Sequence, residues 1–164
     1  MIQFTPAQPG DECILGQLRQ QCWAATYRGI YPDDMLDHFD FAWHAKHDRA
    51  RINNPNFDVC IIRDSDTPIG YMVIRHSEPP LLYSLYLIPM YQRRGIGKAA
   101  FDRMVAYCHE HSLSYFLCDC QPENSNAIAF YQRMKGSIIA RDEGNAEAYM
   151  NSVTLRFDIS KEAP

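Results

Sequence analysis

One short segment combines glycine with positively charged side chains. It reads Gln92-Arg93-Arg94-Gly95-Ile96-Gly97-Lys98, and it separates an apolar run typical of a strand from an apolar periodicity typical of a helix. A helix that begins here presents unpaired backbone N–H groups and the positive end of its dipole. The glycines let the backbone approach a ligand, and the basic side chains supply charge for a pyrophosphate. The segment therefore predicts an anion site, although a glycine turn with solvated basic residues is the plainer alternative.

A nicotinamide dinucleotide site is a second interpretation of the same loop. The stretch 95–100 fits G-x-G-x-x-A, and Asp119 follows about 20 residues later, where an acid would bind a ribose. Two observations argue against this interpretation. Residues 89–94 separate the glycines from the end of the strand, and fewer than 70 residues follow the loop. That is too little chain for two mononucleotide-binding halves.

The elements around the loop alternate between strands and helices. A first helix follows Asp11, which is expected to cap it, and Gly136 is expected to close the last helix. The order β-α-α-β-β-β-α-β-α-β-β predicts an α/β (α+β) fold, a mixed sheet with helices packed on its faces. Apolar spacing and turn residues predict strands over 2–5, 57–63, 69–75, 81–88, 115–120, 137–141 and 149–159, and helices after 11, over about 33–52, after 97 and over 125–135.

Length and composition narrow the class of protein. The 164 residues predict one domain, 1–164, and no apolar run approaches the roughly 18 residues of a membrane span. The net charge of −4 argues against a general affinity for nucleic acid or anionic lipid. The N-terminus shows no signal-peptide pattern, and the six cysteines lie mostly within apolar patterns that favour reduced core residues. We therefore expect a cytoplasmic protein with no membrane or nucleic-acid partner.

The loop resembles the Q/R-x-x-G-x-G/A pyrophosphate loop of the GCN5-related N-acetyltransferase (GNAT) superfamily. A hydrophobic-Pro pair precedes that loop in the family, as Ile88-Pro89 does here. Residues 23–32 resemble the W-x-x-x-Y-x-G-x-x-P region of many bacterial members. The predicted element order is that of the GNAT fold, with a mostly antiparallel sheet and helices on both faces. The family's acidic residue followed by N-x-x-A-x-x-F/L-Y-x-x-x-G is matched by Asp119, Asn124, Ala127, Phe130, Tyr131 and Gly136.

This resemblance implies transfer of an acetyl group from acetyl-CoA to a primary amine by direct attack in a ternary complex. An amine with a lysine-like pKa of about 10.4 needs about 4.6 kcal/mol to lose its proton at pH 7, so a base is useful. Position in the motif predicts Asp119 as that base, with Glu78 as a weaker alternative through water. Tyr131 is predicted to donate a proton to the leaving thiolate, the alternative being a core tyrosine.

The resemblance also implies which residues contact the two substrates. The backbone of Leu87 is expected to meet the pantetheine arm and the oxyanion, and Asn124 contacts the pantetheine unless it only caps the following helix. Trp23, Tyr27 and Tyr31 are expected to line the acceptor pocket. The predicted cofactor-binding residues are Leu85, Leu87, Gln92, Arg93, Arg94, Gly95, Ile96, Gly97, Lys98, Asn124, Ala127 and Tyr131.

Other polar clusters carry weaker signals. His44-x-x-His47, His109-x-His111 and Cys118-x-Cys120 lack further ligands at a recognisable spacing, so no metal is expected. A small-molecule amine or a peptide amine is the expected partner, and dimers are frequent in the family. An acyl-CoA-binding or sensor module without catalysis is the alternative from another functional class.

Overall fold

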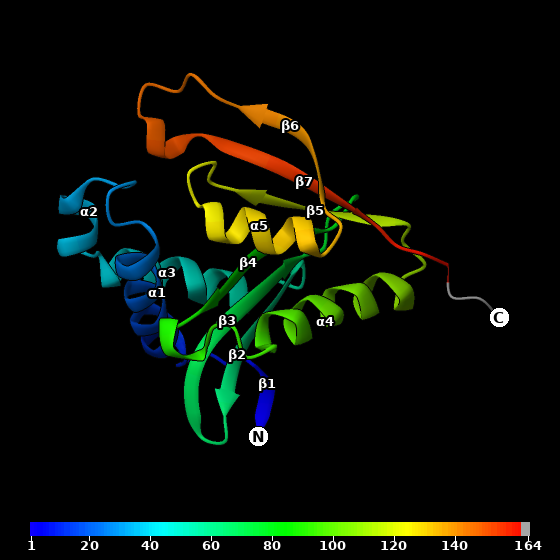
Figure 1. The fold of residues 1–164 in the computed structure, drawn as a ribbon. Coiled ribbons are helices and arrows are strands. Elements are labelled where there is room, and N and C mark those ends of the chain that lie inside the picture. The colour runs from blue at the N-terminus through cyan, green and yellow to red at the C-terminus, as the bar shows by residue number, and fades with distance from the viewer. Residues whose placement is uncertain (162–164) are drawn as a thin grey trace.

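The computed structural model describes residues 1–161 and places seven strands in one mixed sheet (Figure 1). This confirms the predicted fold class. The helices and strands, in chain order, are β1 (Ile2–Pro6), α1 (Glu12–Thr26), α2 (Asp33–Asp37), α3 (Phe41–Ile52), β2 (Phe57–Asp64), β3 (Thr67–Arg75), β4 (Leu81–Leu87), α4 (Ile96–Glu110), β5 (Tyr115–Cys120), α5 (Ser125–Arg133), β6 (Ser137–Asp142) and β7 (Ser152–Asp158), with single 3₁₀ turns at Pro89–Tyr91 and Ala148–Met150.

The sheet has the order β1-β2-β3-β4-β5-β7-β6, and every neighbouring pair is antiparallel except β4 and β5. The parallel ladder between β4 and β5 has a single registered pair, Leu81 with Leu117. That pair lies at the start of β4, so the two strands separate towards the end that leads into the glycine loop. The separation creates the gap in which the candidate site is built.

Helices cover both faces of the sheet because the central strands are apolar on both sides. One face packs on α4 and α5 through a buried cluster that includes Met72, Leu82, Met104, Phe116 and Leu155. The other face of β2 and β3 packs on α1 through Leu15, Leu18, Ile61 and Tyr71. Figure 1 shows α1 and α3 on one side of β2–β4 and α4 on the other.

The single helix predicted over about 33–52 is wrong, because the chain leaves the helical path between α2 and α3. The Asp40 carboxylate accepts a hydrogen bond from the backbone N–H of Trp43 at 2.9 Å and caps α3. Phe39 stands outside both helices, with its ring stacked on His44 at 4.4 Å between centroids. The side chain of Asp11 was expected to cap α1, but it accepts from the backbone N–H of Gln8 instead.

The end of α5 also differs from the sequence prediction. The helix ends at Arg133, and Lys135 rather than Gly136 adopts the left-handed conformation, with φ of 66°. Gly136 is required for space, because a Cβ there would lie 2.6 Å from the ring of Phe157. Its N–H donates to the carbonyl of Tyr131 at 2.9 Å, so this glycine holds the end of α5 against β7.

Of the helices formed by residues 1–161, none combines the length and apolar character that crossing a bilayer demands.

Candidate active site

The glycine loop leads into α4, whose first turn has no side-chain cap. Gly95 is the N-cap of α4 with a left-handed φ of 80°, and no side chain hydrogen-bonds to the first turn. The first backbone bond of the helix runs from the N–H of Ala99 to the carbonyl of Gly95, at 3.0 Å. The N–H groups of residues 96–98 therefore have no acceptor within α4. A 15-residue helix with free amides at its N-terminus favours an anion at this end.

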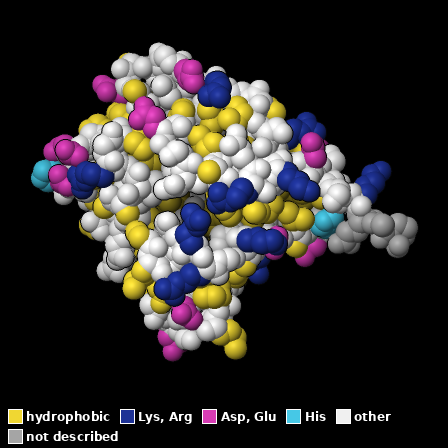
Figure 2. Space-filling model, viewed as in Figure 1, with side chains coloured by type: hydrophobic (Ala, Val, Ile, Leu, Met, Phe, Trp, Pro, Cys, Tyr) yellow, Lys and Arg dark blue, Asp and Glu magenta, His cyan; other side chains and the backbone are white. Residues whose placement is uncertain are grey.

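Basic side chains surround those amides. Lys98 pairs with Asp102 at 2.7 Å, and the guanidinium of Arg94 lies 5.1 Å from the ring centroid of Tyr91. Arg93 has a left-handed φ of 62°, which belongs to the same sharp turn as Gly95. Figure 2 shows Lys and Arg side chains gathered over α4, α5 and the loop before α4. The loop therefore presents positive charge in addition to its amides.

Gln92 ties the loop to the end of β4. Its side-chain amide donates to the carbonyl of Leu87 at 3.0 Å. The N–H of Ile88 donates to the carbonyl of Ile69 at 2.9 Å, so Ile88 faces β3. Because successive residues of a strand face opposite neighbours, the N–H of Leu87 and that of Leu85 point away from β3 and into the gap. Of the predicted cofactor-binding residues, Gln92 thus holds the loop against the end of β4. Leu85 and Leu87 direct their backbone N–H groups into the gap.

On the far side of the gap, alternate residues of β5 face opposite ways. Cys118 and Cys120 are buried against α4 and α5, whereas Asp119 is exposed. Asp119 accepts a hydrogen bond from the hydroxyl of Thr154 at 2.6 Å. Tyr131 is buried on the thiol side, beside Cys118, and burial raises the pKa of its phenol well above 10. The structure therefore places the two predicted catalytic side chains, Tyr131 and Asp119, on different faces of β5.

Five aromatic side chains from four parts of the chain form what we call the aromatic cluster: Trp23 and Tyr27 from the end of α1, Tyr31 from the α1–α2 connection, Tyr86 from β4 and Tyr149 from the β6–β7 connection. The phenol oxygens of Tyr27 and Tyr86 lie 2.6 Å apart and share a hydrogen bond. Tyr31 stacks on Tyr27 with centroids 4.2 Å apart, and Tyr149 lies 5.3 Å from Tyr31. The cluster brings the predicted acceptor residues together beside the gap.

Burial keeps these phenols neutral. It raises the pKa values of Tyr27, Tyr31 and Tyr86 above the ordinary value near 10. The groups that most affect Tyr27 after burial are Tyr86, Cys120 and Asn124, and no carboxylate is among them. At neutral pH these three phenols are therefore uncharged hydroxyl groups among aromatic rings.

The sequence was also compared with models of known protein families. The sequence model described as "Acetyltransferase (GNAT) family" matches residues 18–136. The chain belongs to the GNAT acetyltransferase family.

Solved structures share the GNAT fold with this chain at low sequence identity. The PaiA N-acetyltransferase of Thermoplasma acidophilum, solved with coenzyme A, superposes with a TM-score of 0.82 at 16% identity over 96% of this chain and 99% of that one. An acetyltransferase of Thermus thermophilus gives 0.76 at 15% identity, over 97% of each chain. The ribosomal-protein-S18-alanine N-acetyltransferase of Escherichia coli gives 0.73 at 12% identity, over 99% and 97%. A search of curated protein sequences found no match.

Two other predicted residues of this GNAT protein have defined positions. Asn124 caps α5, because its side-chain oxygen accepts from the N–H of Ala127 at 3.3 Å, which is the capping role given above as the alternative to a pantetheine contact. Its side chain also lies beside the Tyr27 phenol. Glu78 is exposed in the connection before β4, whereas the loop follows the other end of that strand. Seven residues of extended chain separate the two ends by about 20 Å, so Glu78 lies away from the gap.

Sequence reasoning missed Tyr86 and Tyr149. Tyr86 had a usable signal, because it alternates with Leu85 and Leu87 on the strand that leads into the GNAT loop. Its side chain must therefore face α1, from which Tyr27 projects. Tyr149 had no local signal, since only the return of the β6–β7 connection brings it to Tyr31.

Acidic side chains gather over α2, beside the aromatic cluster that holds the predicted acceptor residues. Within and beside α2, Arg28 pairs with Asp33 at 3.1 Å and with Asp37 at 2.9 Å, and Asp34 pairs with His38 at 2.8 Å. Figure 2 shows Asp and Glu side chains over α2 and over the β6–β7 connection, with basic side chains beside them, and a separate group of basic side chains near α4. Carboxylates are therefore in excess over α2, whereas basic side chains predominate around the glycine loop.

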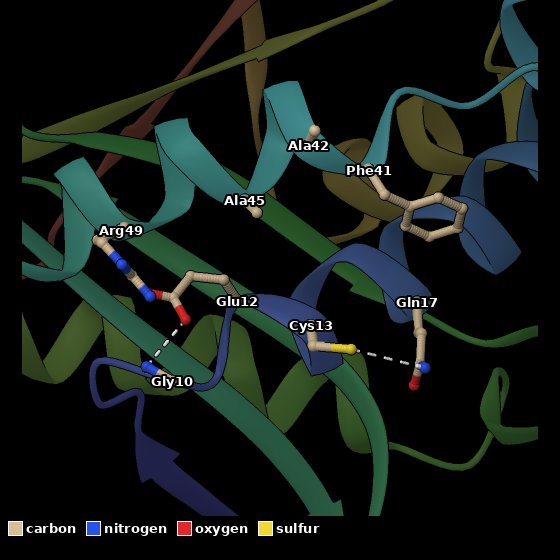
Figure 3. A pocket seen from close by; sticks show the side chains of 8 residues that line it. All are labelled: Gly10, Glu12, Cys13, Gln17, Phe41, Ala42, Ala45 and Arg49. Carbon is tan, nitrogen blue, oxygen red and sulfur yellow. Dashed lines mark hydrogen bonds and ion pairs between the residues drawn. The ribbon is translucent and has the colours of Figure 1, made fainter.

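A hollow of about 610 Å³ lies between α1 and α3, away from the β4–β5 gap (Figure 3). Its floor holds Glu12, whose carboxylate accepts from Arg49 at 2.6 Å and from the backbone N–H of Gly10 at 2.8 Å. These polar groups already satisfy one another, and the GNAT loop lies on a different element. In the part of the chain that the structure describes, no three His, Cys, Asp or Glu side chains are grouped to hold a metal ion.

Proposed function

We propose that this protein transfers an acetyl group from acetyl-CoA to a primary amine by direct attack in a ternary complex. One observation carries the proposal: the uncapped, basic N-terminus of α4 lies at the open end of the β4–β5 gap, and the buried Tyr131 phenol lies on the other side of it. An anion site and a proton donor are the two parts that this reaction needs from the protein. Membership of the GNAT family supports the same conclusion.

The described residues fit acetyl-CoA. The free amides of residues 96–98, with Arg93, Arg94 and Lys98, would hold the diphosphate at the helix N-terminus. The backbone of Leu85 and Leu87 would hold the pantetheine arm in the gap, in the manner of an added strand, with Asn124 and Ala127 at the start of α5 on the opposite side. Acetyl-CoA supplies the acetyl group and a thiolate leaving group.

Tyr131 is proposed as the proton donor to that thiolate. A phenol whose pKa is raised by burial stays protonated at neutral pH, so it can donate whenever the thiolate forms. The N–H of Leu87, which points into the gap, is proposed to stabilise negative charge on the acetyl oxygen. Both groups belong to rigid elements, which keeps their geometry fixed during the reaction.

Asp119 stays a prediction of the sequence motif. Its carboxylate is exposed, and Thr154 donates to it. A proton that it accepts from the amine would therefore have to travel through water rather than directly. The pH dependence of an Asp119→Asn variant decides whether it has this role.

The acceptor is proposed to be a cationic amine in free solution, of a small molecule or a peptide. Over α2 the three carboxylates of Asp33, Asp34 and Asp37 outnumber the one guanidinium, that of Arg28, and this net negative charge supports a cation at that end of the site. The structural neighbours named above include an enzyme that modifies alanine of a ribosomal protein, which keeps peptide amines among the candidates. Six cysteines without a disulfide between them support the proposal of a cytoplasmic enzyme.

The test combines calorimetry with a turnover assay. Coenzyme A should bind with saturation, and acetyl-CoA with a panel of amines should release free thiol over time together with acetylated amine. Saturable binding without turnover on any amine would instead support an acyl-CoA-binding module. Absence of coenzyme A binding at millimolar concentration would contradict the proposal altogether.

A further inference from the structure

We propose that the hydrogen-bonded phenols of Tyr27 and Tyr86 are the binding site for the acceptor amine, and that they accept it in its neutral form, so that no side chain of the enzyme acts as the base. This inference rests on the proposed acetyl transfer. It assigns a role to Tyr86, and it replaces a catalytic base with selection of the free amine.

The position of the two phenols supports the assignment. Tyr86 lies on β4 between Leu85 and Leu87, whose backbone faces the gap, and its ring stacks on buried Tyr71 at 5.4 Å. Tyr27 directly follows the last residue of α1, and its phenol lies beside Cys120 and Asn124 on the other side of the gap. The Tyr27–Tyr86 hydrogen bond therefore joins the end of α1 to β4, on the strand that would hold the acetyl group and beside the wide end of the β4–β5 gap.

Two phenols are suited to a neutral amine. Whichever phenol donates the shared hydrogen, each oxygen keeps a free lone pair, so the pair can accept the two N–H groups of R-NH₂ and leave the nitrogen lone pair free to attack. An ammonium ion would lose its hydration without gaining a negative charge in return. The site therefore favours the uncharged amine, which is the form that attacks.

The titratable groups around the pair agree with this chemistry. On one side these are Tyr71 from β3, Arg19 from α1 and Tyr31 from the α1–α2 connection. On the other side they are Cys118 and Cys120 from β5, Tyr131 from α5 and Tyr149 from the β6–β7 connection. The charged groups near the pair are Arg19 and Asp48, which form a buried ion pair with each other, so they add no net charge to the site. Burial raises the pKa values of Tyr27, Tyr31, Tyr71, Tyr86, Tyr131, Cys118 and Cys120, so these groups stay protonated at neutral pH and are not available as bases.

The proton balance needs no additional group. The ammonium ion, attracted by the carboxylates over α2, releases one proton to water as it enters the site. The amine nitrogen then forms a bond to the acetyl carbon as the carbon–sulfur bond breaks. The second amine proton is lost to water, and Tyr131 supplies one to sulfur and is reprotonated from solvent.

The first test is Tyr86→Phe, with Tyr83→Phe as the matched control on the same strand. Tyr83 is 41% exposed, and its phenol contacts Arg51 rather than the gap. Tyr86→Phe should raise the KM for the amine about tenfold, the effect of a lost hydrogen bond, with unchanged affinity for coenzyme A. Tyr83→Phe should change neither. A Tyr86→Phe protein that folds, binds coenzyme A and keeps its amine KM within twofold overturns the inference.

The second test is the pH dependence of kcat/KM for two acceptors, the best amine of the panel and its β-fluorinated analogue of lower pKa. If the enzyme selects the free amine, the acidic limb moves down by the difference between the two amine pKa values. A limb at the same pH for both acceptors indicates a base on the enzyme and overturns the inference, while acetyl transfer itself stands. Failure of every amine to react, by contrast, removes the proposed function and this inference with it.

Discussion

The guanidinium of Arg19 donates two hydrogen bonds to the carboxylate of Asp48, at 2.7 and 2.9 Å, and both residues are buried. The pair joins α1 to α3. Arg19 also lies 5.1 Å from the ring centroid of Tyr71, which stacks on Tyr86. Through the ring of Tyr71, Arg19 thus connects α1, the helix that leads into Tyr27, with the strand that carries Tyr86.

Asp48→Ala should destabilise the protein by about 3–5 kcal/mol, because it leaves the Arg19 charge buried without its partner. Urea denaturation monitored by circular dichroism measures the free energy of unfolding. Asp37→Ala is the matched control, because Asp37 pairs with Arg28 at the surface and should matter little. A loss for Asp48→Ala no larger than that of the control would mean that the buried pair does not hold α1 and α3 together.

The pair of Glu12 and Arg49 should make stability depend on pH. The hydrogen bond from Arg49 lowers the pKa of the buried Glu12 carboxyl below its ordinary value. A carboxyl whose pKa is lower in the folded state stabilises the folded protein at pH values above the pKa of the unfolded state, which is about 4.3. This stabilisation is lost as the pH falls through the pKa of the folded state. Glu12→Gln should therefore be less stable than the wild type at pH 7, and the difference should shrink at pH 3. Equal differences at both pH values would contradict this account.

Gly95→Ala should weaken coenzyme A binding, because it forces a side chain into the left-handed turn that exposes the amides of α4. Gly144→Ala is the control: its φ is 83°, against 80° for Gly95, and neither site has an atom within 4 Å of an added Cβ. Both variants should lose about 1–2 kcal/mol of stability. Calorimetry should show reduced affinity for coenzyme A in Gly95→Ala alone, and an equal reduction in both would place the diphosphate elsewhere.

Tyr131→Phe should lower kcat about 100-fold, the low end of the usual contribution of a general acid, while the affinity for acetyl-CoA stays unchanged. The ring contacts with Phe130 and Phe157 remain in this variant, so folding should be preserved. Tyr115→Phe, at the start of the strand β5 and stacked with Arg156, serves as the control. Turnover of Tyr131→Phe within twofold of the wild type would remove the phenol from the mechanism.

Local patterns in the sequence predicted the elements that depend on local chemistry. The loop 92–98, the helix after it and the alternation of β5 follow from glycine, apolar period and strand geometry. The break between α2 and α3 was missed because Phe39 fits a helical apolar face, and only Asp40 in the capping position reveals the boundary. The Tyr31–Tyr149 and Tyr27–Tyr86 contacts join residues more than 50 positions apart. Strand alternation indicates which face of the sheet Tyr86 takes, but no local pattern reveals the partner in either contact.

The role of Asp119 can be separated from that of the phenols by its effect on pH dependence. Asp119→Asn keeps a side-chain oxygen that can accept from Thr154, so the strand β5 should be undisturbed. If water takes the proton and the phenols select the free amine, the acidic limb of kcat/KM should stay at the same pH in this variant. A limb that moves or disappears in Asp119→Asn would restore the carboxylate as the base, acting through water from the opposite face of β5. The control is Asp158→Asn, which removes a carboxylate at the end of the neighbouring strand β7, where Asp158 pairs with Arg156.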